Sequence, residues 1–367
     1  MQFNKINKIT NKTKDLLSNS INKVIKNNKF IMGPDVEILE KNLLNFTGSK
    51  FCLGVSSGTD ALLISLMALG VKRNDEVIVP SFSWISTASV IKFLEAKPIF
   101  VDIERDSCNI DIEKIEKSIT KRTKCIIFVS LFGNVPNIDQ INKIGKKYKL
   151  HIIEDGAQSF GAEYKNKKSC NLTTIGCTSF FPSKPLGSFG DAGAIFTNNR
   201  KLFLKMKAIR VHGQVKRGIH NVLGLNARID TLQCAILNVK LGIFEKELKL
   251  RKKKFDYYYN FFKKHKFKYI NLIRYEKFGK SAFAQFCILS SKRKFLIDKF
   301  KKNKIPYAIY YPNPIDKQKI FKIKSSKVKK VSNMISKKIL SLPFGPYITK
   351  QEQDKVLNIF KRYQKQL

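Results

Sequence analysis

The chain has 367 residues, of which 43% are hydrophobic, and this apolar content excludes an intrinsically disordered protein. The length exceeds the usual size of one compact core, so we expect two domains, or one large domain with an appendage. With 70 Lys+Arg against 28 Asp+Glu the net charge is +42, and a field of this sign attracts nucleic acid, an anionic membrane or an anionic small substrate.

The lysines by themselves do not identify a partner. They are spread along the chain, and the local basic runs at 251–254 and 327–330 have helix-like surroundings without a nucleic-acid motif. A solvated helix face in a protein with a generally lysine-rich surface explains such runs. We therefore expect no nucleic-acid partner, and keep a basic nucleic-acid-binding protein only as a remote alternative.

The cysteine pattern indicates a reducing compartment. The seven cysteines are scattered and never spaced as C-x-x-C, which suits small buried thiols better than disulfides. The four histidines show no ligand spacing, so we expect no metal site. The first residues lack the apolar core of a signal peptide, and no apolar run reaches membrane-spanning length. We therefore expect a soluble cytoplasmic protein with no membrane partner.

The first two thirds of the chain alternate between strands and helices. A polar amphipathic helix over 11–30 stops near Gly33-Pro34, and a second helix begins at Asp35 and ends at Gly48. The strands that follow are expected at 51–55, 76–80, 99–102, 125–131 and 151–154, and the helices at 61–69, 85–95, 111–120 and 138–148. Because their apolar character is continuous, these strands predict a mostly parallel sheet covered by helices on both faces. In such sheets ligands bind at the carboxyl ends of the strands.

The pattern changes after a long helix that is expected over 231–262. A strand at 283–289, a further helix and the segment 307–311 follow, which suggests a smaller α+β domain. We therefore divide the chain into an N-terminal helical arm (1–32), a large domain (33–245) and a small C-terminal domain (246–367).

Three turns that follow predicted strands carry candidate chemistry. Ser57-Gly58-Thr59 leads into a helix N-terminus, where backbone N–H groups and the helix dipole attract an anion, although such residues also cap helices that bind nothing. Asp155 ends an apolar strand and is either a partner for a protonated ring nitrogen or an ordinary loop acid. Trp84, the only tryptophan, either stacks on a flat ring or belongs to the core.

Lys184 differs from the other lysines by its surroundings. It follows an aromatic pair and two serines, and glycines come after it at 187, 190 and 193. Desolvation among apolar neighbours lowers the pKa of a lysine, so that its neutral amine can attack a carbonyl. Together with a strand-end acid, Lys184 is suited to hold an aldehyde cofactor as an imine. The glycine spacing does not fit a nucleotide-binding loop.

In this order, the anion turn, the aromatic ring, the strand-end acid and the lysine resemble the DegT/DnrJ/EryC1/StrS family of sugar aminotransferases. The resemblance runs from Gly33 to about Pro346, and it is carried by the segments 57–62, 155–161, 179–184, 210–214 and 225–233. It implies an α/β, fold-type I transferase, with a large domain around a mostly parallel sheet and a smaller α+β C-terminal domain. It also implies pyridoxal 5′-phosphate as the cofactor.

The resemblance gives each candidate residue a role at the cofactor ring. Lys184 would bind the cofactor covalently and later shuttle protons. Asp155 would pair with the ring nitrogen, Trp84 would stack on the ring, and Gln158 would lie beside the phenolate oxygen.

The phosphate of the cofactor would be held by Gly58, Thr59 and Ser179. Asn226 of the partner subunit would complete this phosphate site, which implies a homodimer with shared active sites. Family members with a histidine in place of this lysine act as dehydratases, so the presence of Lys184 favours transamination.

Within the family, the stretches 167–172 and 177–187 are most similar to one branch. That branch aminates UDP-2-acetamido-2-deoxy-3-oxo-glucuronate with glutamate as the donor, for bacterial surface polysaccharide and lipopolysaccharide. Arg228 would then bind a substrate carboxylate, or it forms an ion pair at the subunit interface, and Tyr310 and Tyr311 are the other expected substrate contacts. Tyr310 stands where the family has histidine, so another keto-sugar nucleotide, aminated at its 4-position, or a cyclitol remains an alternative substrate.

Overall fold

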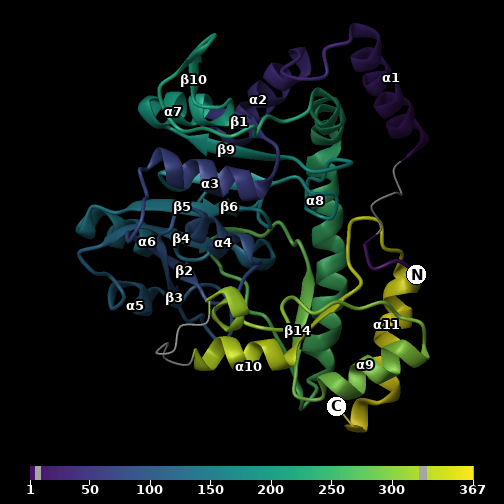
Figure 1. The fold of residues 1–367 in the computed structure, drawn as a ribbon. Helices are drawn as coiled ribbons and strands as arrows, with labels where there is room; N and C mark the ends of the chain where they lie inside the picture. Colours follow the sequence, from purple (N-terminus) through teal and green to yellow (C-terminus); the bar gives the residue numbers. More distant parts are fainter. Residues whose placement is uncertain (5–9, 322–328, 367) are drawn as a thin grey trace.

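A seven-stranded sheet forms the centre of the large domain in the computed structural model, which describes residues 1–4, 10–321 and 329–366 (Figure 1). Its strands, in spatial order, are β1 (Phe51–Val55), β9 (Gly193–Thr197), β8 (Ile175–Ser179), β5 (His151–Asp155), β4 (Thr123–Val129), β2 (Glu76–Pro80) and β3 (Lys97–Val101). The run from β8 to β3 is parallel throughout. Only β9 opposes its neighbours β1 and β8. The prediction of a mostly parallel sheet is confirmed.

Helices cover both faces of this sheet. One face packs against α3 (Gly58–Ala68), α4 (Ser86–Phe93) and α7 (Arg200–Arg210), and the other against α2 (Pro34–Thr47), α5 (Ile112–Glu116), α6 (Ile138–Tyr148) and α8 (Thr231–His265). Strand β2 shows the two-sided burial: Val77 and Val79 belong to the core under α3, whereas Ile78 belongs to the core under α6. Continuous apolar strands are what this two-sided burial requires.

The long helix α8 connects the large domain to a C-terminal lobe (Figure 1). Its first half packs against α2 and against the N-terminal helix α1 (Asn11–Asn27). Its second half contributes Phe255, Tyr258 and Phe262 to a separate core. The domain division at 245/246 stays a prediction, and α8 crosses it without a break.

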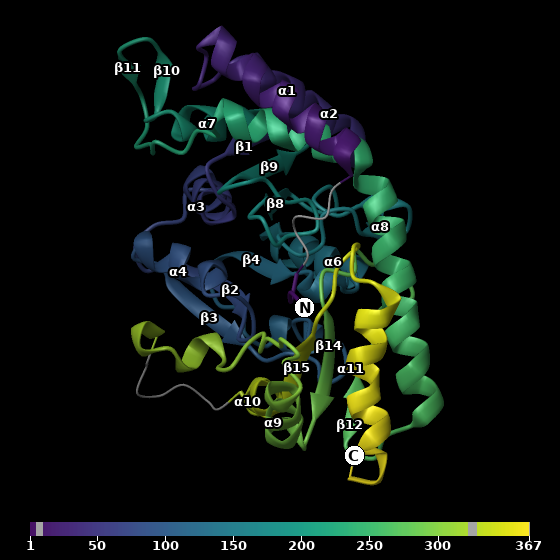
Figure 2. The same cartoon turned by 90° about the vertical axis from the view of Figure 1, so that its right-hand side faces the viewer.

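The C-terminal lobe contains a three-stranded antiparallel sheet with helices around it. The sheet consists of β12 (Ile270–Leu272), β14 (Phe286–Ser290) and β15 (Ile339–Leu342), and the helices are α9 (Arg293–Lys302), α10 (Lys330–Lys338) and α11 (Lys350–Arg362). A hairpin of β10 (Gln214–Lys216) and β11 (Ile219–His220) projects from the large domain beside α7 (Figure 2). Three two-residue strands, β6 (Glu163–Tyr164), β7 (Lys167–Lys168) and β13 (Gly279–Lys280), form a further small sheet.

Several predicted elements end earlier than expected: the helices expected over 11–30 and 85–95 end at Asn27 and Phe93. The helix expected over 111–120 is α5, which stops at Glu116 and continues as turns. The strand expected to reach Leu131 ends at Val129, and Phe132 then adopts a left-handed backbone with φ 58°. The Phe132 N–H donates to the Gln158 side chain at 2.7 Å, a tertiary contact that no local pattern announces.

The cysteines are small buried thiols, as expected. All seven are buried and free. Among the residues that the structure describes, no helix is both long enough and apolar enough to cross a membrane. Of the basic run at 327–330, residues 327 and 328 lie outside the described residues.

Candidate active site

The predicted residues converge at the edge where the parallel strands have their carboxyl ends. Asp155 is the last residue of β5, Ser179 is the last residue of β8, and the Ser57-Gly58 turn follows β1. A Cβ added to Gly58 would lie 2.7 Å from the Ser179 Cβ, so only glycine allows the two segments to approach this closely. Segments that are far apart in the sequence therefore meet at one place, as the family resemblance predicts.

The turn before α3 has the form of an anion cradle. Ser57 caps the helix, and its Oγ accepts from the Asp60 N–H at 3.0 Å. Thr59 Oγ1 donates to Ser86 Oγ at 2.9 Å, which ties the first turn of α3 to α4. Gly193 passes so close that an added Cβ would lie 2.6 Å from the Ser57 carbonyl carbon. The positive end of the α3 dipole faces this tightly packed turn.

Asp155 is a buried carboxylate that is positioned by one hydroxyl and one backbone amide. Thr87 Oγ1 donates to its Oδ2 at 2.8 Å, and the Ala157 N–H donates to its Oδ1 at 3.2 Å. Burial raises the pKa of Asp155 above its ordinary value, while the Thr87 hydrogen bond and the charge of Lys184 oppose this shift. A protonated ring nitrogen at this carboxylate would stabilise its charged form.

Lys184 lies in a tight loop that begins after Phe181. Its N–H donates to the Phe181 carbonyl at 2.8 Å, and an added Cβ on Gly187 would lie 2.4 Å from the Pro182 oxygen. Burial lowers the pKa of Lys184 below its ordinary value, and the charge of Asp155 partly opposes this. At a given pH, a larger fraction of Lys184 than of an exposed lysine is therefore in the neutral, nucleophilic form.

Aromatic side chains surround one side of the site. Trp84 is 58% exposed, so it is not a core residue. Its ring centroid lies 6.0 Å from that of Tyr311, with the two planes tilted by 44°. Gln158 Nε2 donates to the Tyr311 hydroxyl at 3.0 Å, so a contact between Gln158 and a cofactor oxygen would have to share or replace this bond.

Asn226 and Arg228 lie together on the segment that pairs with the end of β1. Arg228 Nε donates to Asn226 Oδ1 at 2.9 Å, and Arg228 pairs with Val55 in an isolated β-bridge. Within the described residues Arg228 forms no ion pair. The ring centroid of Tyr310 lies 5.8 Å from that of Tyr311, with the planes tilted by 58°, and 6.2 Å from that of Phe3. The structure thus brings the expected substrate residues together in pairs, and their roles stay predictions.

The residues fit pyridoxal phosphate in three respects. A glycine-lined helix N-terminus suits a phosphate, a buried acid whose charged form is disfavoured by burial would be stabilised by a protonated ring nitrogen, and a lysine with a lowered pKa suits the aldehyde. Thr87, which positions Asp155, was not among the residues predicted from the sequence. It lies in the helix expected over 85–95, three residues after Trp84, and this closeness in the sequence to a candidate ring-stacking residue was the available signal.

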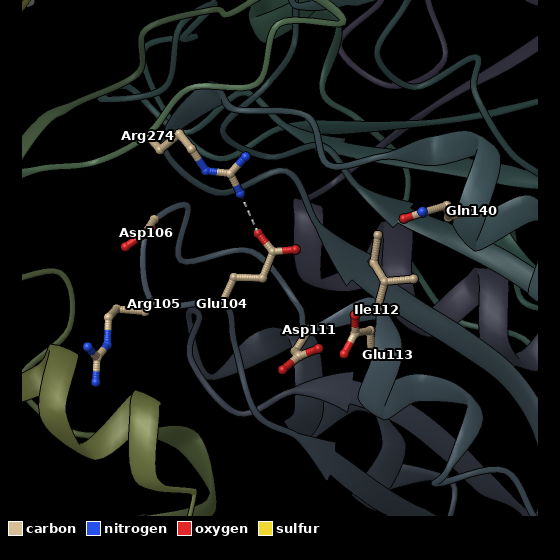
Figure 3. A pocket seen from close by; sticks show the side chains of 8 residues that line it. All are labelled: Glu104, Arg105, Asp106, Asp111, Ile112, Glu113, Gln140 and Arg274. Atoms are coloured by element: carbon tan, nitrogen blue, oxygen red, sulfur yellow. Dashed lines mark hydrogen bonds and ion pairs between the residues drawn. The ribbon is translucent and has the colours of Figure 1, made fainter.

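A cavity of about 390 Å³ lies away from these residues, beyond the end of the outermost strand β3 (Figure 3). Four carboxylates line it, and Arg274 crosses it to form an ion pair with Glu104 at 3.0 Å. None of the predicted site residues lines this cavity. Volume alone therefore does not identify the site in this chain.

The comparison with known proteins agrees with this geometry. Residues 11–361 match the DegT/DnrJ/EryC1/StrS aminotransferase family. The UDP-2-acetamido-2-deoxy-3-oxo-D-glucuronate aminotransferase of Pseudomonas aeruginosa is 43% identical over 91% of this chain and 92% of its own length. A DegT DnrJ EryC1 StrS aminotransferase from Brucella abortus superposes with a TM-score of 0.94 at 33% identity, over 99% of both chains.

A further solved structure bears on the cofactor. NtdA from Bacillus subtilis, with bound cofactor PMP, superposes with a TM-score of 0.91 at 30% identity, over 97% of this chain and 83% of that one. PMP is the aminated form of pyridoxal phosphate. The family match, the relatives and the fold agree, and this chain belongs to the DegT/DnrJ/EryC1/StrS family of pyridoxal-phosphate-dependent sugar aminotransferases.

Proposed function

We propose that this chain aminates the 3-oxo group of a UDP-sugar, with UDP-2-acetamido-2-deoxy-3-oxo-glucuronate as the substrate and glutamate as the amino donor. The observation that carries the proposal is that the half-buried Lys184 lies close enough to the buried Asp155 for their charges to act on each other. The identity of the Pseudomonas aeruginosa relative, 43% over nearly the whole chain, supports the choice of sugar.

Each residue has a defined task in this reaction. Bound pyridoxal phosphate supplies the electron sink that makes the proton on the reacting carbon acidic. Lys184 Nζ removes the proton from the α-carbon of the donor and delivers a proton to C3 of the sugar in the second half-reaction. Asp155 keeps a negative charge next to the ring nitrogen, and Thr87 holds this carboxylate in place. Trp84, with its exposed ring, shields one face of the site from water.

The proposal includes a homodimer in which each active site uses residues of both subunits. Asn226 and Arg228 are the residues proposed to reach the site of the other subunit. They lie on the segment that pairs with the end of β1 and are hydrogen bonded to each other. We further propose that the enzyme works in the cytoplasm, in the synthesis of surface polysaccharide or lipopolysaccharide.

A panel of substrates tests the choice of sugar. The purified protein, loaded with pyridoxal phosphate, is given glutamate and a series of oxo-sugar nucleotides, and the formation of 2-oxoglutarate is followed. The 3-oxo-glucuronate should give the highest kcat/KM. A preference for a 4-oxo sugar or a cyclitol would contradict the substrate but not the chemistry. Arg228→Met should lower activity on the uronate far more than on an uncharged 3-oxo sugar.

A further inference from the structure

A small cavity beside Lys184 is unusually rich in buried charge. It is lined by the loop 182–185, by one face of α8, by the segment 344–347 and by Asn4. Its volume is about 30 Å³, the space of about two water molecules. A carboxylate group fits into this space, whereas a sugar ring does not.

Helix α8 supplies three charged side chains to this cavity. Lys240, Glu247 and Arg251 are 6%, 5% and 7% exposed, and their spacing places them on one face of the helix. Charged side chains are almost never buried to this extent unless they are paired. Among the described residues no ion pair joins any two of the three, so α8 contributes two basic side chains and one acidic side chain to the cavity wall.

Two of these side chains are satisfied by polar partners. Lys240 Nζ donates to the Gly187 carbonyl, three residues beyond Lys184. Glu247 Oε1 accepts from the Tyr347 hydroxyl at 2.5 Å. These bonds hold the Lys184 loop and the segment 344–347 against α8.

Arg251 is the member of this group without a good partner. Among the residues that the structure describes, its Nη1 reaches only the Phe283 carbonyl, at 3.4 Å, and its buried Nε has no hydrogen-bond partner. The edge of a guanidinium that carries Nε is one of the edges with which arginine binds a carboxylate through two parallel hydrogen bonds. Burial also lowers the pKa of Arg251 to about 10, against the charge of Glu247. An anion beside Arg251 would compensate the buried charge.

We propose that Arg251 binds a carboxylate of the amino donor in this cavity and so holds the donor amine next to Lys184. The inference rests on the proposed function, because an amino donor reaches this site only in a transamination. An amino-acid donor must present its amine and a carboxylate together, and Arg251 and Lys184 line one small cavity. Arg228, the residue proposed for the sugar carboxylate, does not line it.

Separate half-reactions test this assignment on the holoenzyme. Glutamate is added to the pyridoxal form, and the oxo-sugar is added to the pyridoxamine form, each followed by the cofactor absorbance. Arg251→Met should raise the half-saturating glutamate concentration about tenfold to a hundredfold, and Arg251→Lys should raise it less. The sugar half-reaction should change by no more than about twofold. Calorimetric titration with glutarate, an unreactive dicarboxylate, gives a readout without turnover, and Arg251→Met should weaken this binding as well.

A second arginine provides the matched control. Arg293 in α9 is half-buried, donates to the Ser336 carbonyl and lies outside the cavity, so Arg293→Lys should leave glutamate and glutarate binding unchanged. Unchanged glutarate binding in Arg251→Met, or an equal defect in both half-reactions, would overturn the assignment. If Arg251→Met does not fold, Arg251→Lys decides between the same outcomes. A wild-type protein that takes up no pyridoxal phosphate would contradict the proposed function instead.

Discussion

Gln158 Nε2 donates a hydrogen bond to the Tyr311 hydroxyl at 3.0 Å, and these two residues are 153 positions apart in the chain. The other end of the Gln158 amide accepts from the Phe132 N–H at 2.7 Å. Burial raises the pKa of Tyr311, and the charge of Asp155 adds to this shift, so the phenol stays neutral at physiological pH. The bond therefore ties the site edge of the large sheet to the segment between α9 and α10 of the C-terminal lobe.

Removing this connection should cost both stability and activity. We expect Tyr311→Phe to lower the free energy of unfolding by about 1 kcal/mol, the net worth of one hydrogen bond. It should also lower kcat/KM for the sugar, because Gln158 loses the hydrogen bond that positions it and the Tyr311 ring, which contacts Trp84, is held less firmly. Urea unfolding and steady-state kinetics measure the two effects. Tyr257→Phe is the control, since it removes a hydroxyl bond to Asp354 within the C-terminal lobe and should lower stability alone.

Replacing Asp155 and Glu154 one at a time should distinguish the roles of these two adjacent acids of β5. Asp155→Asn removes the negative charge at the ring nitrogen, and we expect kcat to fall about a hundredfold or more. Glu154 is its matched control: it is buried on the opposite side of β5 and accepts bonds from Ser169 at 2.6 Å and from Cys170 N–H at 2.7 Å. Glu154→Gln should affect thermal stability while leaving the kcat of the folded fraction close to that of the wild type. Equal loss of kcat in both variants would contradict the role of Asp155.

The hydroxyl of Thr87 should matter through Asp155. Thr87→Val keeps the shape of the side chain and removes the donor at 2.8 Å, so we expect kcat to fall about tenfold to a hundredfold. Thr197→Val is a comparable change, because the Thr197 hydroxyl donates to the Thr174 carbonyl at 2.8 Å far from the reacting groups. A normal kcat in Thr87→Val would show that the carboxylate does not need this hydroxyl.

The pH dependence of cofactor capture should report on Lys184. Only the neutral amine attacks the aldehyde, and burial lowers the pKa of Lys184 from the ordinary value of 10.5. The rate of pyridoxal phosphate binding should therefore rise with pH and level off below pH 10.5, whereas a model amine would still be accelerating there. Absorbance after mixing the cofactor-free protein with pyridoxal phosphate measures this rate. Lys184→Ala should show no covalent binding at any pH, and Lys168→Ala should behave like the wild type.

Mixed dimers should reveal whether the active sites are shared. Lys184→Ala and Arg228→Met are each expected to be inactive on the uronate, yet a dimer with one copy of each would contain one intact site. Random mixing at equal amounts should restore about a quarter of the wild-type activity, because about half of the dimers are mixed and each has one working site of two. Mixtures that stay inactive would place Lys184 and Arg228 in the same subunit's site.

The sequence by itself determined the layout of the large domain and the order of its candidate residues. Continuous apolar strands such as 76–80 specify a sheet that is buried on both faces, and the motifs around Gly58, Asp155 and Lys184 specify the family. These signals are local, and they can be recognised in the sequence because each motif follows directly after its strand.

Only the tertiary structure decided which partners these residues have. Thr87 reaches Asp155, Gln158 reaches Tyr311, and Arg251 lines the cavity of Lys184 with no hydrogen-bond partner for its Nε among the described residues. Hydrogen bonds and burial depend on how segments that are far apart in the sequence pack against each other. The sequence pattern of a single segment does not contain the distances between such segments. For the same reason the early turn at Phe132, which is held by Gln158, could not be predicted from the apolar run that precedes it.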